Sequence, residues 1–432
     1  MKCVHIILVM LLAAAAGGAF AEEPQSLSLK QAQELAIKSH PQITAADLIA
    51  LAARQSVREA RSGFYPTITA NATAVGVTGA NTRIAAGGLN NPLILDRDAE
   101  GINVSQVITD FGRTANLTES AKLHSRAEAA HAVATRAQIL LAVDSAYFGA
   151  LQAQSVLEVA RQTVKTRQDL FDQVTELAKN KIKSGLDLSF AGVNLDEARL
   201  LLAGASNDVQ SASAVLVNML GERESRSFIL AEESAAAMRV LDAGDLVETA
   251  LRNRPDLMRL RYERDAAVRF ARAEKDLRYP TISAVGSAGL IPVRDPLLKD
   301  HYAAAGVNLS LPIFDGMLFS ARRESAELKS RAVAASVRDE ENNVIRDVRI
   351  AVLNRNYAAD RMDLTAKFLA SASQAFDLVQ ARYQAGSSSI VDLSQAQLTK
   401  TQAEIAQARA KYDYQVRDAI VSFEIGELGR EP

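Results

Sequence analysis

The sequence predicts a mostly α-helical fold with a small β part, built from two copies of one long-helix hairpin. The first observation is composition: the 432 residues are rich in alanine, lack tryptophan and include only 5% aromatic residues. Such a composition suits long, closely packed helices. The second is an internal duplication. The third is a helical pattern of about 70 residues in each copy, several times the usual helix length of about 11–12 residues.

The N-terminus has the three parts of a secretory signal peptide, which we assign to residues 1–21. Lys2 precedes an apolar stretch, and an A-x-A site ends at Ala21, so we expect cleavage between Ala21 and Glu22. The apolar stretch is short for a membrane span, which disfavours the alternative of an uncleaved anchor. Cys3 is the only cysteine and precedes the apolar stretch, so we do not expect a lipoprotein. No later run of about 18 apolar residues predicts a transmembrane helix.

The chain repeats its own plan. Four pairs of segments correspond in the same order: HPQI (40–43) with RPDL (254–257), FYPTITA (64–70) with RYPTISA (278–284), GINVSQVITDFG (101–112) with GVNLSLPIFDG (306–316), and KSGLDLSFAGVNLDEARL (183–200) with QAGSSSIVDLSQAQLTKT (384–401). These matches indicate a duplication. We predict a first structural repeat over 22–225, a linker over 226–239 and a second repeat over 240–428. The last match places Gly185 opposite Gly386, and we predict that both glycines form hairpin-tip turns.

Each half contains two segments in which apolar and polar residues alternate, which is the pattern of a half-buried strand. We predict strands at about 66–80, 101–110, 280–290 and 302–312, with connecting loops over 81–100 and 291–301. The alternation fits either a soluble hairpin with one buried face or a transmembrane barrel. Four strands cannot close a membrane barrel, because the smallest have about eight, and an open edge in lipid leaves backbone groups unpaired. Strands in a membrane would therefore require several chains.

A long helical pattern follows the second strand of each half and is followed by a returning helix. The long segments run from about Arg113 to Lys181 and from about Met317 to Tyr383, and the returning segments run from Leu188 to Gly221 and from Ile390 to Gly426. At 1.5 Å per residue, each long segment would measure on the order of 100 Å. Such a rod suits a coiled coil rather than a round core. We place the hairpin tips near 183–188 and 385–390.

The sequence offers little catalytic or metal-binding chemistry. His124, Glu128 and His131 lie on one helix face, but zinc takes three or four ligands and no further histidine or cysteine is near. A solvated helix face is the better interpretation. There is no P-loop, G-x-S-x-G or H-E-x-x-H motif, and the net charge of −2 gives no indication of a nucleic-acid partner. We predict a protein that is not an enzyme and binds neither a metal nor a cofactor.

The duplicated plan of two strands and a long-helix hairpin, together with DFGR (110–113), FDG (314–316) and YQAGSSSIVDL (383–393), resembles the TolC-type outer-membrane efflux protein family. The resemblance covers essentially the whole chain after the leader. It implies a homotrimer with twelve strands in one barrel in outer-membrane lipid, continuous with an α-helical barrel in the periplasm. It also implies a passive exit channel of a tripartite efflux or type I secretion system, opened by a periplasmic adaptor protein and an inner-membrane pump, with no cofactor.

The resemblance further implies a periplasmic entrance at the hairpin tips that is closed at rest. Asp392 occupies the position of an aspartate that three chains arrange as a ring. Such a ring would attract cations, and repulsion between its carboxylates would raise their pKa. The alternative is a carboxylate that stabilises the first turn of a helix.

Tyr383 matches a tyrosine that helps to bond the tip shut in one branch of the family, but its partners there differ in this chain. Ser388 stands where that branch has an arginine, and Phe190 stands where it has a threonine. Our hypothesis for a replacement is Asp187 paired with Lys181 or Lys183, or apolar packing by Phe190.

Two classes of function remain open from the sequence. The first is the trimeric channel in the outer membrane, extending into the periplasm. The second is a periplasmic or surface coiled-coil scaffold without a channel. A periplasmic binding protein or enzyme is a third and weaker alternative, because no plausible site is present. A channel should fractionate with the outer membrane as a detergent-stable trimer, whereas a scaffold should be soluble without detergent.

Overall fold

The computed structural model describes residues 25–76, 85–86, 89–90, 97–222, 228–233, 239–294 and 299–429. The expected signal peptide, its cleavage site and Cys3 lie outside the described residues, as do parts of the 226–239 linker. The chain divides into two compact units, each drawn from both halves of the sequence. Unit 1 comprises Met1–His40, Ile139–Val240 and Arg355–Ala419, and unit 2 comprises Pro41–Gln138, Leu241–Asn354 and Ile420–Pro432.

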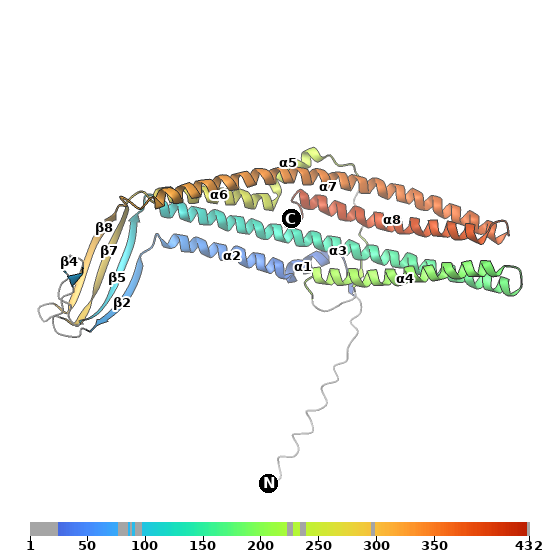
Figure 1. The fold of residues 1–432 in the computed structure, drawn as a ribbon, viewed down its shortest axis with the longest axis horizontal. Coiled ribbons are helices and arrows are strands. Elements are labelled where there is room, and N and C mark those ends of the chain that lie inside the picture. Colours follow the sequence, from blue (N-terminus) through green and yellow to red (C-terminus); the bar gives the residue numbers. More distant parts are fainter. Residues whose placement is uncertain are drawn as a thin grey trace, which may run out of the picture. The chain divides into compact units, whose positions relative to one another are not determined.

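Both halves contain the same four helices in the same order, and each helix has the length of its counterpart. α1 (Leu29–Ser39) and α5 (Ala243–Asn253) have 11 residues, α2 (Pro41–Ser62) and α6 (Pro255–Asp276) have 22, α3 (Arg113–Lys179) and α7 (Leu318–Gln384) have 67, and α4 (Gly185–Met219) and α8 (Ile390–Glu424) have 35. Figure 1 shows α3 turning back into α4 and α7 turning back into α8. The predicted long-helix hairpins are confirmed, while the repeat boundaries stay a prediction.

Proline and glycine set the helix ends at equivalent places in the two halves. Pro41 and Pro255 begin α2 and α6, because proline is tolerated in the first turn, where its missing N–H costs nothing. Gly221, just after α4, has a φ of +76°, and a Cβ there would lie 2.8 Å from the backbone of Ser39. Gly426, just after α8, has a φ of +73° and would meet Asn253 at 2.9 Å. Both sites therefore require glycine for conformation and for space.

Four long strands form one antiparallel sheet in the order β2-β5-β7-β8. They are β2 (Thr67–Val75), β5 (Arg97–Thr109), β7 (Thr281–Val293) and β8 (His301–Ser310). β5 begins before the predicted 101, because Asp98 and Glu100 pair with neighbouring strands although they break the apolar alternation. Two short strands, β3 (Ala85–Ala86) and β4 (Leu89–Asn90), pair with each other within the predicted 81–100 loop.

Over the part of the sheet nearer the helices, the register gives one apolar and one polar face; toward the other end, Asp98, Glu100 and His301 lie on the apolar side. The apolar face carries Ile68, Ala70, Ala72, Ile102, Val104, Ile282, Ala284, Ala288, Ala303, Ala305, Val307 and Leu309, and the polar face carries Thr67, Thr69, Asn71, Asn103, Ser105, Ser283, Ser287, Asn308 and Ser310. Large apolar side chains such as Ile68, Val307 and Leu309 are exposed in the single chain. In a soluble sheet such a face is normally buried, whereas a membrane barrel turns it toward lipid.

A second, smaller sheet was not predicted. β1 (Gln25–Leu27) and β6 (Phe228–Leu230) form a parallel pair. The buried Tyr147 hydroxyl lies beside both strands, within hydrogen-bonding distance of the carbonyl oxygens of Leu27 (2.8 Å) and Ala231 (2.7 Å). Three-residue strands carry no detectable alternation, so this tertiary support could not be anticipated from the sequence.

The cores of the two units are helix interfaces filled with small and branched side chains. In unit 1, Val156, Leu157 and Ala160 of α3 pack with Ala205 of α4 and Ala408 of α8. In unit 2, α5 and α6 cover a stripe of α7, and the buried members are Ala250, Leu257, Val337, Val344, Val348 and Val352. Both clusters have the helix-on-helix packing expected of a coiled-coil-like rod.

Among the described residues, one helix, α4, is long and apolar enough to cross a membrane by length and composition alone. No such helix was predicted from the sequence, because the apolar residues of α4 do not form an uninterrupted run but are interspersed with glycine and serine. Ala191, Leu195 and Ala198 are buried within the chain. α4 is therefore a packed half of the first hairpin, with an apolar exposed face.

Candidate functional site

The second hairpin tip is a tight reversal around Gly386. The N–H of Ser387 donates to the carbonyl of Arg382 (2.8 Å), and the N–H of Gly386 donates to the carbonyl of Tyr383 (3.1 Å). With φ of +75° at Gly386, these bonds form a Schellman motif, in which a left-handed residue satisfies the last carbonyls of a helix. Gly386 is thus the turn glycine that the sequence predicted.

The first tip has the same geometry around Lys181 rather than Gly185. Lys181 has a φ of +59°, and the N–H of Ile182 donates to the carbonyl of Leu177 at 2.9 Å. Gly185 is the first residue of α4, so its predicted equivalence with Gly386 is wrong. The shared glycine suggested this pairing. The counterpart of Gly386 is instead Lys181, about one helical turn before Gly185.

The corrected register makes Asp187 and Asp392 equivalent, since each closes a capping box at the start of a returning helix. Ser184 N–H donates to Asp187 Oδ2 at 3.0 Å, and Asp187 N–H donates to Ser184 Oγ at 3.1 Å. Ser389 and Asp392 exchange the same two bonds, both at 3.1 Å. Such reciprocal bonds satisfy two orphan N–H groups of the helix. The first-turn interpretation of Asp392 is therefore confirmed.

Within a single chain, these caps lower the pKa of both carboxyls. For Asp392 the hydroxyl of Ser389 is the main cause, followed by the Ser389 N–H and the hydroxyl of Ser388. For Asp187 the main causes are the N–H and hydroxyl of Ser184. The direction for Asp392 is opposite to the rise expected from a ring of three carboxylates, which only an assembly of chains would create. Asp392 is exposed and accessible to such neighbours.

The two hairpins share one apolar cluster just behind the tips. Its buried members are Val174, Ala191, Phe376, Tyr383, Ile390 and Leu393, and Phe171 and Leu188 pack against them. A hydrogen bond from Asn194 Nδ2 to Ser394 Oγ, 2.6 Å long, also joins the hairpins. Of this cluster, the sequence predicted a gate role only for Tyr383, and it placed Val174 and Phe171 on the apolar seam of the long helix. The apolar spacing of α3 and α7 near their ends was the available signal for Val174 and Phe376.

Tyr383 is the one predicted site residue that crosses between the hairpins. Its side chain is only 5% exposed, and its hydroxyl is buried without a hydrogen-bond partner among the described residues. The Lys183 ammonium of the first tip lies 4.4 Å from the centre of the Tyr383 ring, which is cation–π geometry. Burial, followed by the nearby Asp187 charge, raises the pKa of Tyr383.

The other predicted residues occupy simpler positions. Ser388 donates its hydroxyl proton to Asp392 at 3.1 Å. Phe190 is 39% exposed and lies outside the apolar cluster, so apolar packing by Phe190 does not join the hairpins within a chain. Asp187 caps α4. Of its two hypothesised partners, Lys181 forms the turn, while Lys183 lies over Tyr383 and also interacts electrostatically with Asp187.

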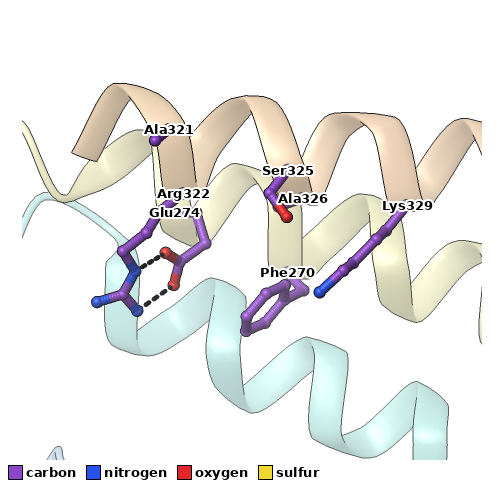
Figure 2. A pocket seen from close by; sticks show the side chains of 7 residues that line it. All are labelled: Phe270, Glu274, Ala321, Arg322, Ser325, Ala326 and Lys329. Atoms are coloured by element: carbon purple, nitrogen blue, oxygen red, sulfur yellow. Dashed lines mark hydrogen bonds and ion pairs between the residues drawn. The ribbon is translucent and has the colours of Figure 1, made fainter. Parts of the chain in front are cut away.

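Metal-binding and pocket chemistry are weak in the described residues. The imidazole of His124 lies 3.8 Å from the Glu128 carboxylate, and no group of three His, Cys, Asp or Glu side chains that could hold a metal occurs among the described residues. Figure 2 shows a surface pocket of unit 2 that is lined by Phe270, Glu274, Arg322 and Lys329, among others. In it, the Arg322 guanidinium donates two hydrogen bonds of 2.7 and 3.1 Å to the Glu274 carboxylate. The Arg322 guanidinium thus compensates the charge of the buried Glu274 carboxylate.

Comparison with known families gives one match over most of the chain. The family model described as "Outer membrane efflux protein" matches residues 32–222 and 246–422. These two blocks take in both helical hairpins and all four strands of the large sheet.

Individual relatives are distant but extensive. The chain is 22% identical over 425 residues to "Outer membrane protein TolC" of Escherichia coli, covering 95% of this chain and 85% of that protein. It is 26% identical over 300 residues to "Cobalt-zinc-cadmium resistance protein CzcC" of Cupriavidus metallidurans, covering 68% of each. The structure of the Campylobacter jejuni CmeC outer membrane channel matches with a TM-score of 0.80 at 16% identity, over 92% of this chain and 85% of that one. The last match shows a shared fold.

Proposed function

Because the chain belongs to the outer membrane efflux protein family, we propose that it is the passive exit channel of a tripartite efflux or type I secretion system. Its periplasmic tip would open when an adaptor protein and an inner-membrane pump engage it. The channel would supply no energy, bind no cofactor and catalyse no reaction. We also propose export with cleavage between Ala21 and Glu22, without a lipid anchor, into the outer membrane, with the helical hairpins in the periplasm.

The observation that carries this proposal is the four-stranded sheet. It has one apolar and one polar face, and its edge strands β2 and β8 each pair on one side only within the described sheet. Unpaired edges in lipid would cost several kcal/mol for each unsatisfied backbone group. Both edges become paired when β8 of one chain bonds to β2 of the next. Three chains would give the twelve-stranded barrel that the family resemblance implies.

The hairpin tips are the proposed gate. Asp392 is exposed at the start of α8, where three copies could face one another across a pore and favour cations. We further propose that Lys183 over Tyr383 holds the two hairpins of one chain together at rest, in place of the polar bonds that Ser388 and Phe190 cannot make. Opening would separate Lys183 from the Tyr383 ring.

The direct test is current through planar bilayers. We expect the purified protein to fractionate with the outer membrane, to run as a detergent-stable trimer and to conduct ions. Asp392→Ala should lower cation selectivity and relieve block by added divalent cations, and Lys183→Met should raise the open probability. Lys367→Met is the matched control. Lys367 is exposed, and its ammonium donates to Asp363 on the same helix at 2.5 Å.

Two failures of this test would mean different things. A soluble protein without current would favour the coiled-coil scaffold. Current that is unchanged in both variants would keep the channel and reject the proposed gate residues.

A further inference from the structure

A belt of exposed apolar and aromatic side chains surrounds the end of the large sheet where its strands meet the helices. Its members are Phe64 and Tyr65 before β2, Phe111 after β5, Tyr279 before β7, and Ile313, Phe314 and Met317 after β8. Phe314 is 82% exposed. Gln106, which lies on the apolar face of the sheet, donates to the carbonyl of Phe64 at 3.1 Å, so this polar side chain lies at the level of the belt.

The backbone holds one of these rings in place under strain. Phe111 has a φ of +56°, a conformation that is costly for a bulky residue and that persists only where surrounding structure requires it. Its ring remains largely exposed and contacts the ring of Tyr279, with centroids 5.8 Å apart. The turn after β5 holds this conformation, since the N–H of Phe111 donates to Thr109 Oγ1 at 3.2 Å and the N–H of Gly112 donates to Asp110 Oδ1 at 3.2 Å.

An arginine guanidinium lies against one of these two rings. Arg278 lies over Tyr279, 5.0 Å from the ring centre, and donates to its hydroxyl at 3.1 Å. Arg278 is exposed, and the ring holds it without neutralising its charge. At the same junction, the Nε of Arg113 is buried and has no hydrogen-bond partner among the described residues.

The acidic residues of the junction are already engaged inside the chain. Asp110 accepts from the N–H of Thr114 at 2.7 Å, and Asp315 accepts from the N–H of Phe319 at 2.8 Å, so both cap the long helices. Asp276 accepts from Asn116 Nδ2 at 2.8 Å and also interacts electrostatically with Arg278. The surface therefore presents the exposed Arg278 guanidinium together with aromatic rings.

We propose that this junction binds the phosphate of anionic phospholipids in the membrane leaflet that faces the helices. Arg278 would contact the phosphate, while Tyr279 and Phe111 would lie at the boundary between headgroups and acyl chains. Aromatic residues favour this boundary, and nearby basic residues attract anionic headgroups. The inference rests on the proposed function, since only a membrane position of the sheet brings lipid to the belt.

Lipid titration of the detergent-purified full chain tests the assignment. The probes are fluorescent phosphatidylglycerol and phosphatidylcholine, with inorganic phosphate as competitor. We expect tighter binding of phosphatidylglycerol, and Arg278→Gln should weaken it about fivefold without affecting phosphatidylcholine. Phe111→Gly, which suits the left-handed backbone, should weaken both lipids. Arg161→Gln, an exposed arginine of unit 1, should change neither.

Several results would overturn the proposal. They are equal binding of the two lipids by the native chain, an Arg278→Gln chain that behaves like the Arg161→Gln control, and a Phe111→Gly chain that binds like the native protein. Competition by inorganic phosphate as strong as that by phosphatidylglycerol would reassign the site to a free anion. Bilayer current of the native protein is recorded in parallel, so a missing lipid preference with intact current rejects this inference alone.

Discussion

At the scale of single residues, Asp144 has the clearest physical consequence. Its carboxyl is 3% exposed in α3, and its described hydrogen bond comes from Gln33 Nε2 of α1 at 2.6 Å. Burial raises the pKa of Asp144 to about 6, against the opposing effect of the Gln33 bond. Burying an ionised carboxylate is energetically costly. The contact between α1 and Asp144 is therefore less favourable at neutral pH, where the carboxyl loses its proton, than at acidic pH.

Asp144→Asn should remove this pH dependence. The folded state holds the proton more tightly than the unfolded state, so the stabilisation is complete below the ordinary pKa of 3.8 and is lost as the pH rises through about 6. The difference corresponds to about 3 kcal/mol at neutral pH. Native protein should lose stability between about pH 4 and pH 6, and little more above that, in thermal melts followed by circular dichroism. The variant, which keeps an acceptor for Gln33, should lose less, and an identical pH dependence would refute the account.

At the scale of elements, the two hairpin tips use one motif with different residues. Both end the long helix with a left-handed residue and begin the returning helix with a Ser-x-x-Asp box. Gly386 adopts this backbone freely, whereas Lys181 adopts it at a cost of about 1–2 kcal/mol. The first tip is therefore less well suited to its turn than the second.

Reciprocal substitutions should reveal this asymmetry. Gly386→Ala should destabilise the second tip by about 1–2 kcal/mol, and Lys181→Gly should stabilise the first by up to about 1 kcal/mol. Gly185→Ala is the control, since Gly185 is helical and no atom lies within 4 Å of the added Cβ. Amide hydrogen exchange around residues 180–188 and 385–392 measures each change. A loosened first tip in Gly185→Ala would restore the glycine-to-glycine register that the structure contradicts.

The sequence predicted the elements whose signals are periodic and long. Sixty-seven-residue helices and alternating strands repeat their pattern many times, so their type and approximate ends followed from spacing alone. The β1–β6 pair depends on Tyr147, which is distant in sequence, and could not be read locally. The predicted pairing of Gly185 with Gly386 was wrong because a left-handed turn residue is usually, but not always, glycine; at the first tip it is Lys181. The cluster of Tyr383 with Val174 and Phe376 forms only when the two hairpins pack together, so it could not be predicted from either segment alone.

At the scale of the whole molecule, we propose that the chain completes its structure only with further copies. Within the described residues, the large sheet has one unpaired edge at β2, one at β8 and an exposed apolar face. In a head-to-tail ring, β8 of each copy would pair with β2 of the next, and the ring would close when the rotation returns to the start. Bare edges would otherwise template uncontrolled strand addition.

Cross-linking between the two edge strands would detect this pairing between copies. Asn71→Cys in β2 and Asn308→Cys in β8 lie on the polar face, and both are introduced into a Cys3→Ser background. Within one chain the two edge strands are separated by β5 and β7, about 14 Å across the sheet at the usual strand spacing. A short bis-maleimide should therefore join neighbouring copies. We expect covalent dimers and trimers on denaturing gels for the double variant and monomers for each single variant. A double variant that stays monomeric while both cysteines react would exclude pairing of β8 with β2 of the next copy.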